Sequence, residues 1–483
     1  MSVSALHKAP ELRHETLRIA GERVETKERI DVTYPYTGEV IGSVGKATLE
    51  DVRRAYKIAR GYKSKLTRYE RYKILMRAGE IIATRLDEIS KLITLESGLC
   101  RKDSLYEVGR ASDVLLFAAN QALVDDGQVF SCDLTHHGKS RKVYTMREPL
   151  QGAITAITPF NHPLNQVIHK IAPAIATNNR TVLKPSEKTP FTAYVLADIL
   201  YEAGLPPEML SVISGDPREI CDEMLTSDDV DLVTFTGGVP IGKYIAGKAV
   251  YKRQILELGG NDPIIVMEDA DVEEAATLAA SGSYKNSGQR CTAIKRMLVH
   301  ESVADRFVEL LVEKTKAVKY GDPMDPNVDM GTVIDEDAAI YFETVVNEAI
   351  AAGATLKCGH IRKGALYSPT VLDNVTLDMR VAREETFGPV SPVIRFKTIE
   401  EAIQLSNGTA FGLSSSICTN RMDYITRFIS ELNVGSVNVR EVPGYRLELT
   451  PFGGIKDSGL GYKEGVLEAM KSFTNTKTYS LPW

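Results

Sequence analysis

The sequence predicts an α/β protein whose parallel sheets are covered by helices. Two observations indicate this fold class. Short apolar runs alternate with longer amphipathic runs over residues 150–270, and a second series begins at residues 263–267, Pro-Ile-Ile-Val-Met. A β-α-β-α order is typical of a parallel sheet. With 483 residues, the chain is long enough for two or three domains.

The first series alternates between expected strands and expected helices. The expected strands are residues 152–157, 181–184, 210–213 and 232–235. The expected helices are residues 164–177, 191–202, 219–225 and one that begins near Pro240. In the first of these helices, apolar residues at 167, 168, 171, 174 and 175 share one face. In the second series, Asp269 or Asp271 is the expected N-cap of the helix that follows the strand.

Residues 126–148 interrupt this alternation. Residues 129–134 and 141–146 resemble two strands around a polar turn, and residues 472–480 alternate like a third strand. A hairpin is only marginally stable alone, and exposed strands invite pairing with another chain. We therefore expect these strands to join copies of the protein.

The overall composition is that of an ordinary globular protein, with 43% apolar and 25% charged residues. The net charge of −6 gives no reason to expect nucleic acid or a membrane surface as a partner. No signal-peptide core and no apolar run of membrane-spanning length is present. The six cysteines are scattered without metal-ligand spacing. We therefore expect no metal site, no disulfide framework and a reducing, cytoplasmic location.

A cysteine and a glutamate, each close to glycine, are the first candidates for catalysis. Cys291 follows Gly288 and Arg290; glycine permits close approach of a ligand, and a cation favours the thiolate. Glu257 ends an apolar run and precedes Gly259-Gly260. A lone cysteine is more often a packing residue, and a carboxylate can simply end a strand. Together, however, the two indicate a covalent enzyme with its own water-activating base.

Two further loops follow expected strands. In residues 158–163, Asn161 can donate its amide to an oxyanion, although an asparagine between prolines is also an ordinary turn residue. His162 is either a substrate contact or an interior histidine. In residues 236–242, glycines precede a helix, where backbone N–H groups bind anions. The GxGxxG spacing is absent, so this loop by itself can equally be a simple turn.

Seven motifs together resemble the aldehyde dehydrogenase superfamily over nearly the whole chain. They are TPFNHP at 158–163, LKPSE at 183–187, FTGG with IG at 235–242, ELGG at 257–260, GQRC at 288–291, EETFGP at 384–389 and PFGGIKDSG at 451–459. The resemblance implies two Rossmann-like domains with parallel sheets and a β oligomerisation element, in a homodimer or homotetramer. The implied divisions are 1–125 with 149–258 for the NAD-binding domain, 259–465 for the catalytic domain, and 126–148 with 466–483 for the oligomerisation element.

The resemblance also implies roles for individual residues. Cys291 would be the nucleophile and Glu257 the base that hydrolyses a thioester, while Asn161 and the Cys291 backbone N–H would form the oxyanion hole. Because Glu257 is present, hydrolysis is expected rather than acyl transfer to coenzyme A. The implied cofactor-binding residues are Pro159, Phe160, Lys184, Ser186, Glu187, Gly237, Gly238, Gly242, Leu258, Glu385 and Phe387. Gly238 replaces the serine common at its position.

The expected cofactor is NAD. A carboxylate at Glu187 would accept a hydrogen bond from the ribose 2′-hydroxyl but repel a 2′-phosphate. Ser186 leaves some use of NADP open.

The substrate is expected to be a small anionic aldehyde, bound by Arg110, Arg290 and His162. Guanidinium groups suit a phosphate, phosphonate or carboxylate; the alternative is that Arg110 merely pairs with an acid. Residues 289–296 are similar to non-phosphorylating glyceraldehyde-3-phosphate dehydrogenases, and residues 441–473 are closer to phosphonoacetaldehyde dehydrogenases. We therefore expect NAD-dependent oxidation of phosphonoacetaldehyde to phosphonoacetate, as in phosphonate catabolism.

Other interpretations remain open from the sequence. Glyceraldehyde 3-phosphate, lactaldehyde and succinate semialdehyde are alternative substrates, and a non-catalytic binding protein is the alternative class. Arg440 and Arg446 are either further anion contacts or solvated loop arginines.

Overall fold

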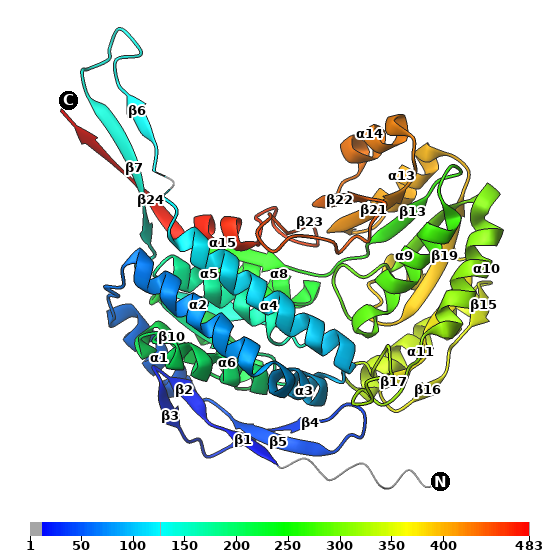
Figure 1. Cartoon of the computed structure of the whole chain (residues 1–483), viewed down its shortest axis with the longest axis horizontal. Coiled ribbons are helices and arrows are strands. Elements are labelled where there is room, and N and C mark those ends of the chain that lie inside the picture. Colours follow the sequence, from blue (N-terminus) through cyan, green and yellow to red (C-terminus); the bar gives the residue numbers. More distant parts are fainter. Residues whose placement is uncertain (1–11, 126, 483) are drawn as a thin grey trace.

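Two seven-stranded sheets, each covered by helices on both faces, form the body of the molecule (Figure 1). The computed structural model describes residues 12–125 and 127–482. The first sheet has the order β12-β11-β8-β9-β10-β2-β3, and its first five strands are parallel. Its strands are β2 (Leu17–Ile19), β3 (Glu22–Val24), β8 (Ala153–Ile157), β9 (Thr181–Lys184), β10 (Leu210–Val212), β11 (Val230–Thr236) and β12 (Arg253–Glu257).

Helices enclose the first sheet because its central strands are apolar on both faces. Strands β8 and β9 are buried along their whole length, as parallel strands between helix layers are. The helices on one face are α2 (Arg68–Thr84), α3 (Leu86–Ser97), α4 (Arg101–Ala122), α5 (Asn165–Ala176) and α6 (Phe191–Glu202). Those on the other are α1 (Leu49–Gly61), α7 (Pro217–Thr226) and α8 (Val239–Ala249). A small sheet of β1 (Arg13–Glu15), β4 (Arg29–Thr33) and β5 (Val40–Gly45) and the 3-10 helix η2 (Pro207–Met209) complete this half.

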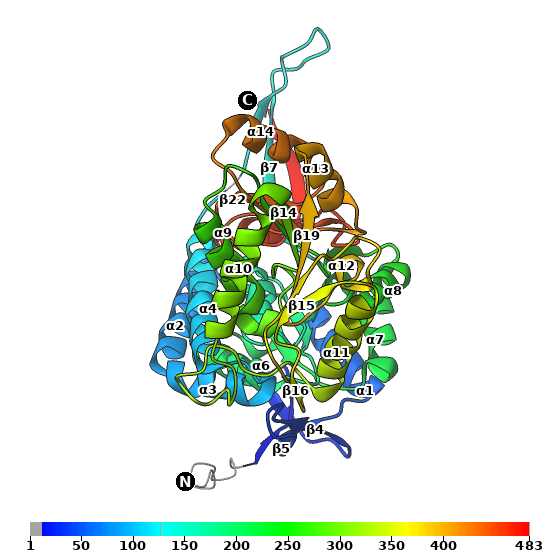
Figure 2. The same ribbon diagram turned by 90° about the vertical axis from the view of Figure 1, so that its right-hand side faces the viewer.

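The second sheet has the order β15-β18-β19-β14-β13-β21-β22 and is parallel except for β15. Its strands are β13 (Pro263–Val266), β14 (Arg296–His300), β15 (Thr355–Cys358), β18 (Thr370–Asp373), β19 (Val390–Phe396), β21 (Ser414–Cys418) and β22 (Ser436–Val439). One face is covered by α9 (Val272–Tyr284) and α10 (Glu301–Ala317); the other by α11 (Glu336–Ala351), α12 (Arg380–Arg383), α13 (Ile399–Asn407) and α14 (Met422–Glu431), as Figure 2 shows. Short elements between them are η3 (Lys285–Gly288), β16 (Arg362–Lys363), β17 (Leu366–Tyr367), β20 (Phe411–Gly412) and β23 (Ile455–Lys456).

A three-stranded arm projects from the first half (Figure 1). Strand β7 (Lys142–Pro149) lies between β6 (Val129–Ser131) and β24 (Thr474–Leu481), and both pairings are antiparallel. Helix α15 (Val466–Ser472), directly before β24, packs on α4 and α5. The C-terminal segment therefore returns to the first half at α15 before it enters the arm as β24.

The predicted fold class is confirmed, and the predicted elements of residues 150–270 are present within a few residues. Asp271 is the N-cap of α9, where its side chain accepts a hydrogen bond from the backbone N–H of Glu274. Asp269 instead accepts a hydrogen bond from Thr419 at 2.7 Å and so ties the end of β21 to the loop between β13 and α9. Strand β6 is shorter than expected, because the chain turns at Cys132, whose N–H donates to Arg141 O and whose carbonyl accepts from Lys139 N. Among the described helices, none combines the length and the apolar character needed to cross a bilayer.

Candidate active site

A strained turn delivers Cys291 to the junction of the two halves. Asn286, Ser287 and Gly288 have φ values of 61°, 53° and 73°, and left-handed backbone costs about 1–3 kcal/mol at a non-glycine residue. Hydrogen bonds hold the turn in place: Asn286 N–H donates to Asp103 Oδ2 at 2.7 Å, and Asn286 Nδ2 donates to Asn161 O at 2.9 Å. A Cβ at Gly288 would lie 2.3 Å from Gly388 O. Only glycine fits there.

The thiol of Cys291 is protonated in the resting site. Burial raises the pKa of the Cys291 thiol to about 11, and the nearby ammonium of Lys295 offsets part of this effect. Lys295 Nζ donates to the carbonyls of Arg290 and Cys291 at 2.6 and 2.9 Å. Because the thiolate is the reactive form, the sulfur must lose its proton before it attacks.

Asn161 lies beside the thiol with one amide hydrogen to spare. Its side chain is buried, and its Nδ2 donates to Gln289 O at 2.8 Å. An amide nitrogen carries two hydrogens, so the second is left for an oxyanion. Asn161 and Cys291 line the same cavity, which agrees with the predicted oxyanion hole.

Glu257 ends β12 and is buried among Glu464 and the cations Lys170, Arg446 and Lys463. Neither of its carboxylate oxygens accepts a hydrogen bond from the described residues. Burial, together with the negative charge of Glu464, raises the pKa of Glu257 well above its usual value. Although burial by itself would raise the pKa of Glu464 too, the ammonium of Lys170, 2.5 Å away, brings it below its usual value. Of the two acids, Glu257 is therefore the one that holds its proton to the higher pH.

A cavity of about 260 Å³ opens beside the thiol. Nine predicted residues line it: Pro159, Phe160, Asn161, Gly237, Gly238, Leu258, Cys291, Glu385 and Phe387. Gln166, Thr236 and Gly259 also line it but were not predicted. Gln166 lies outside the seven motifs, and nothing in the sequence distinguishes Thr236 or Gly259 from the other residues of their motifs. The predicted residues Lys184, Ser186, Glu187, Gly242 and Glu257 lie outside this lining.

The cavity fits the nicotinamide end of a dinucleotide. Thr236 Oγ1 and Gln166 Oε1 are buried there without a hydrogen-bond partner among the described residues. Gly238 is the N-cap of α8 and has no side chain to cover the N–H groups of the helix. The ring of Phe387 meets that of Phe160 edge-on, with 5.9 Å between centroids. Glu385 Oε1 accepts from Gly260 N at 3.0 Å, which leaves its other oxygen for a ribose.

The other predicted cofactor residues form a separate polar group. Lys184 at the end of β9 forms an ion pair with Glu187, and Ser186 Oγ accepts from Lys188 N at 3.2 Å. Gly242, in the first turn of α8, packs under Leu258, since a Cβ there would lie 2.4 Å from Leu258 Cδ2. This contact brings α8 close to the wall of the cavity.

Two arginines, Arg290 and Arg446, lie near the thiol. Arg290 Nη2 donates to Gly282 O at 2.6 Å, while its Nε is buried without a partner among the described residues. Arg446 packs on Phe452 with its Cζ 3.8 Å from the ring centroid, and its charge acts on both Cys291 and Glu257. Arg440 does not belong to this group, because it is exposed and pairs with Glu274 at 2.9 Å.

Two buried acids, Glu448 and Glu107, pair with Arg110, Arg446 and His162, and sequence reasoning missed both. Glu448 accepts from Arg110 Nε at 2.5 Å and lies 3.4 Å from Arg446 Nε. Arg110 therefore pairs with an acid distant in sequence. Glu107 lies 3.4 Å from His162 Nδ1 and accepts from the N–H groups of Leu164 and Asn165 at the start of α5. His162 is half-buried. The only signal in the sequence was that Glu107 and Arg110 are one helical turn apart on α4 and so lie on the same side of that helix.

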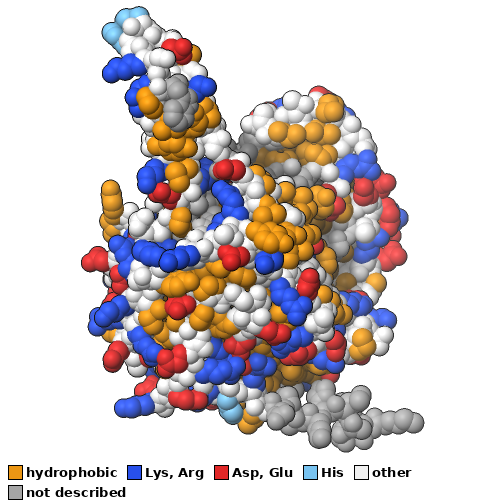
Figure 3. All heavy atoms as spheres, turned by 60° about the vertical axis from the view of Figure 1, so that its left-hand side comes forward, with side chains coloured by type: hydrophobic (Ala, Val, Ile, Leu, Met, Phe, Trp, Pro, Cys, Tyr) orange, Lys and Arg blue, Asp and Glu red, His pale blue; other side chains and the backbone are white. Residues whose placement is uncertain are grey.

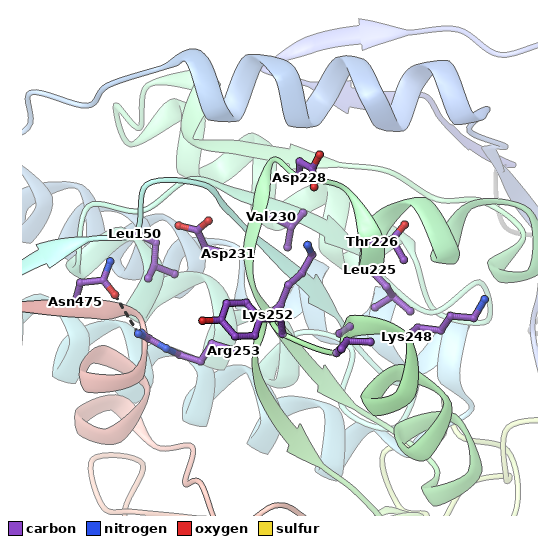
Figure 4. A pocket seen from close by; sticks show the side chains of 13 residues that line it. Leu150, Leu225, Thr226, Asp228, Val230, Asp231, Lys248, Lys252, Arg253 and Asn475 are labelled. Atoms are coloured by element: carbon purple, nitrogen blue, oxygen red, sulfur yellow. Dashed lines mark hydrogen bonds between the residues drawn. The ribbon is translucent and has the colours of Figure 1, made fainter.

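Another cavity lies away from the thiol. Figure 4 shows this space of about 740 Å³ beside the edge strand β12, where Arg253 Nη2 donates to Asn475 Oδ1 at 3.0 Å. None of the predicted site residues lines it. In the described part of the chain, no group of three or more His, Cys, Asp and Glu side chains is placed to hold a metal ion.

The sequence is similar to those of known proteins over nearly its whole length. The aldehyde dehydrogenase family pattern matches residues 23–479. The chain is 37% identical over 462 residues to 3-sulfolactaldehyde dehydrogenase of Priestia aryabhattai, covering 95% of this chain and 96% of that protein.

Two solved structures have the same fold. An NADP-dependent glyceraldehyde-3-phosphate dehydrogenase from Bacillus halodurans C-125, complexed with NADP, superposes with a TM-score of 0.94 at 36% identity and coverage of 97% and 99%. An NAD-dependent aldehyde dehydrogenase from Sinorhizobium meliloti gives a TM-score of 0.92 at 32% identity and coverage of 97% and 95%. These relatives support an enzyme that uses NAD, with NADP possible, but they do not establish phosphonoacetaldehyde as its substrate. The chain belongs to the aldehyde dehydrogenase family.

Proposed function

We propose that the protein oxidises a small anionic aldehyde to the acid through a thioester on Cys291. The observation that carries this proposal is the shared cavity of Cys291 and Asn161, with the charges of Arg290 and Arg446 near the thiol. The thiolate adds to the aldehyde carbon, and the oxyanion that forms accepts hydrogen bonds from Asn161 Nδ2 and the Cys291 backbone N–H. The bound dinucleotide, NAD by preference, supplies a hydride acceptor. Loss of hydride from the adduct leaves the thioester.

Glu257 completes the cycle in this proposal. Its carboxylate takes a proton from water, the resulting hydroxide adds to the thioester carbon, and the C–S bond breaks to release the acid and the thiolate. A raised pKa suits a general base at neutral pH. Lys170 holds Glu464 as an anion beside it, and this charge favours return of the proton to Glu257.

The proposed anionic end of the substrate contacts Arg290, Arg446 and Arg110, with His162 beside them. Burial lowers the pKa of Arg290, since its charge is stripped of water, and its unpartnered Nε can donate to an incoming anion. Glu448 pairs with both Arg110 and Arg446, so it holds the two guanidinium groups in position. Phosphonoacetaldehyde is the substrate we propose; a sulfonate aldehyde is the second candidate, because a relative acts on 3-sulfolactaldehyde.

Replacing Arg290 by methionine tests the anion contact. We expect KM for phosphonoacetaldehyde to rise about 10- to 100-fold, because a charge-assisted hydrogen bond contributes about 1.5–3 kcal/mol. KM for uncharged propanal should change less than about threefold on the same argument. Steady-state kinetics on phosphonoacetaldehyde, 3-sulfolactaldehyde, glyceraldehyde 3-phosphate and propanal measure both effects.

The matched control is Arg440→Met, which removes an exposed arginine that pairs with Glu274 and should leave every KM unchanged. An equal loss on propanal and on the anionic aldehydes would show that Arg290 acts on the thiol and not on the substrate.

The arm is proposed to join copies of the chain into a homodimer or homotetramer. Apolar side chains on it are exposed, and Figure 3 shows them gathered towards its base. The exposed apolar side chains of the arm as a whole include Val129, Phe130, Leu134, Met146 and Tyr479. Strands β6 and β24 are both edges of their sheet, and exposed apolar edges invite pairing.

Light scattering after gel filtration tests this role of the arm. We expect the double variant Val129→Lys, Phe130→Lys to lower the molar mass to that of a smaller assembly, because two added charges cannot be buried in an interface. Lys139→Glu and Lys142→Glu serve as controls for changes of charge alone. A monomeric wild type, or an unchanged mass of the double variant, would contradict the proposal.

A further inference from the structure

Lys285 is an ammonium group without an anionic partner beside the candidate substrate site. It is the first residue of η3, six positions before the thiol. Its Nζ lies 3.1 Å from the ring centroid of Tyr106 on α4. Within residues 12–125 and 127–482, no carboxylate oxygen lies within 4.0 Å of this nitrogen, and it donates no hydrogen bond.

A second cation contacts the same ring. Arg110 Cζ lies 5.9 Å from the centroid of Tyr106. Tyr106 and Arg110 are four residues apart on α4, so they share one face of that helix. Lys285 directly follows α9 in the sequence, whereas Arg110 lies on α4. Cations from two separate elements therefore contact the ring of one exposed tyrosine.

Arg290 adds a third positive charge to this group. The positive charges of Arg290 and Arg110 lower the pKa of Lys285, and that of Arg110 lowers the pKa of Arg290. Asp103 on α4 is the one carboxylate that acts on both Lys285 and Arg290, and its Oδ2 already accepts from Asn286 N. Asp103 accepts from Asn286 and Glu448 pairs with Arg110, so the three cations outnumber these two acids and leave a positive charge that an anion would neutralise.

The protonation of Lys285 is sensitive to pH in the physiological range. Burial lowers the pKa of the Lys285 ammonium to about 8; Asp103 opposes this effect, while Arg290 and Arg110 add to it. The ammonium is therefore charged below about pH 8 and loses its charge above it. An anion bound next to it would raise this pKa, because an opposite charge favours the charged form.

We propose that Lys285 is a specificity-determining residue that binds the anionic end of the substrate and favours a dianion over a monoanion. Attraction between charges scales with their product, so a phosphonate dianion gains more from three surrounding cations than a sulfonate does. The inference rests on the proposed function for the location of the substrate. It goes further by naming a cation that none of the motifs contains and by ranking the anions the site prefers.

The test uses methylphosphonate and methanesulfonate as competitive inhibitors of propanal oxidation by the full-length enzyme. Propanal carries no charge, so its turnover reports on the thiol chemistry, while inhibition reports on the anion site. Inhibition constants would be measured from pH 6.5 to 9.5 for the wild type, Lys285→Arg and Lys285→Met. These pH limits are roughly centred on the Lys285 pKa of about 8.

For the wild type, we expect the inhibition constant of methanesulfonate to rise as pH increases through about 8, because Lys285 loses its charge. Lys285→Arg keeps its charge and should abolish this rise. Lys285→Met should bind methylphosphonate about tenfold more weakly, as expected from the loss of about 1.4 kcal/mol, and should lose less for methanesulfonate.

Methanesulfonate does not titrate over this pH range, so any pH dependence of its inhibition constant comes from the protein. Methylphosphonate itself titrates, and the Lys285→Arg variant, which keeps its charge, reveals that contribution. Equal inhibition of the wild type and Lys285→Met, with propanal turnover intact, would overturn the role of Lys285. Failure of all three proteins to oxidise phosphonoacetaldehyde, with Lys285-dependent inhibition retained, would instead reject the proposed substrate and keep the anion site.

Discussion

Replacing Cys291 by alanine is expected to lower kcat about 10⁴-fold or more for every aldehyde, because the variant cannot form the covalent adduct. Cys291 is half-buried at the cavity, so loss of one sulfur should change the free energy of unfolding by no more than about 1 kcal/mol. NADH formation measures the loss of activity, and thermal unfolding with and without NAD shows that the fold and the cofactor site persist.

Cys358→Ala is the matched control, since Cys358 is equally half-buried but lies in β15, away from the cavity. Its activity should equal that of the wild type. Iodoacetamide followed by intact-mass analysis should show that activity is lost as Cys291 is alkylated. A Cys291→Ala variant with more than about a tenth of wild-type activity would refute covalent catalysis.

Replacing Glu257 by glutamine should separate the two halves of the reaction. The amide cannot accept a proton from water, so the thioester should accumulate, and kcat should fall about 10²- to 10⁴-fold. Rapid mixing should reveal a burst of NADH close to one equivalent per active site, followed by the slow steady rate. Mass spectrometry of the stalled enzyme should show the acyl group on Cys291.

The pH dependence supplies an independent check on Glu257. The base acts when deprotonated, and burial with the charge of Glu464 raises its pKa. Activity of the wild type should therefore fall on acidification at a higher pH than an ordinary glutamate would give, and the residual rate of Glu257→Gln should lack this decline. Glu274→Gln, on the exposed ion pair with Arg440, is the control. An unchanged steady rate without a burst in Glu257→Gln would exclude it as the base.

The fold and the centre of the site were predictable because their signals are local. Buried parallel strands such as β8 and β9 are continuous apolar runs. Such a run can be recognised from the sequence of the strand alone, without knowing which elements pack on it. The motif residues Asn161 and Cys291 also meet in one cavity, since each follows a turn fixed by its own sequence.

The acids around the arginines were not predictable, because their partners are distant along the chain. Arg110 and Glu448 are separated by 338 positions, and no periodicity relates them. The left-handed conformations of Asn286 and Ser287 gave no signal either, since Asp103 and Gly331 impose them from other segments. Likewise, the choice of Asp271 over Asp269 as helix cap depends on Thr419, which is brought near only by the finished sheet.

The turn before the nucleophile has a mechanical consequence. Its residues belong in sequence to the second half of the molecule, yet Asn286 is anchored to Asp103 and Asn161 of the first. If the two halves shift against each other, the reacting sulfur stays in register with the oxyanion donor and with the wall that faces the nicotinamide. Because the turn is anchored in this way, the rest of the second half can move to admit substrate and release product while the reacting atoms stay aligned.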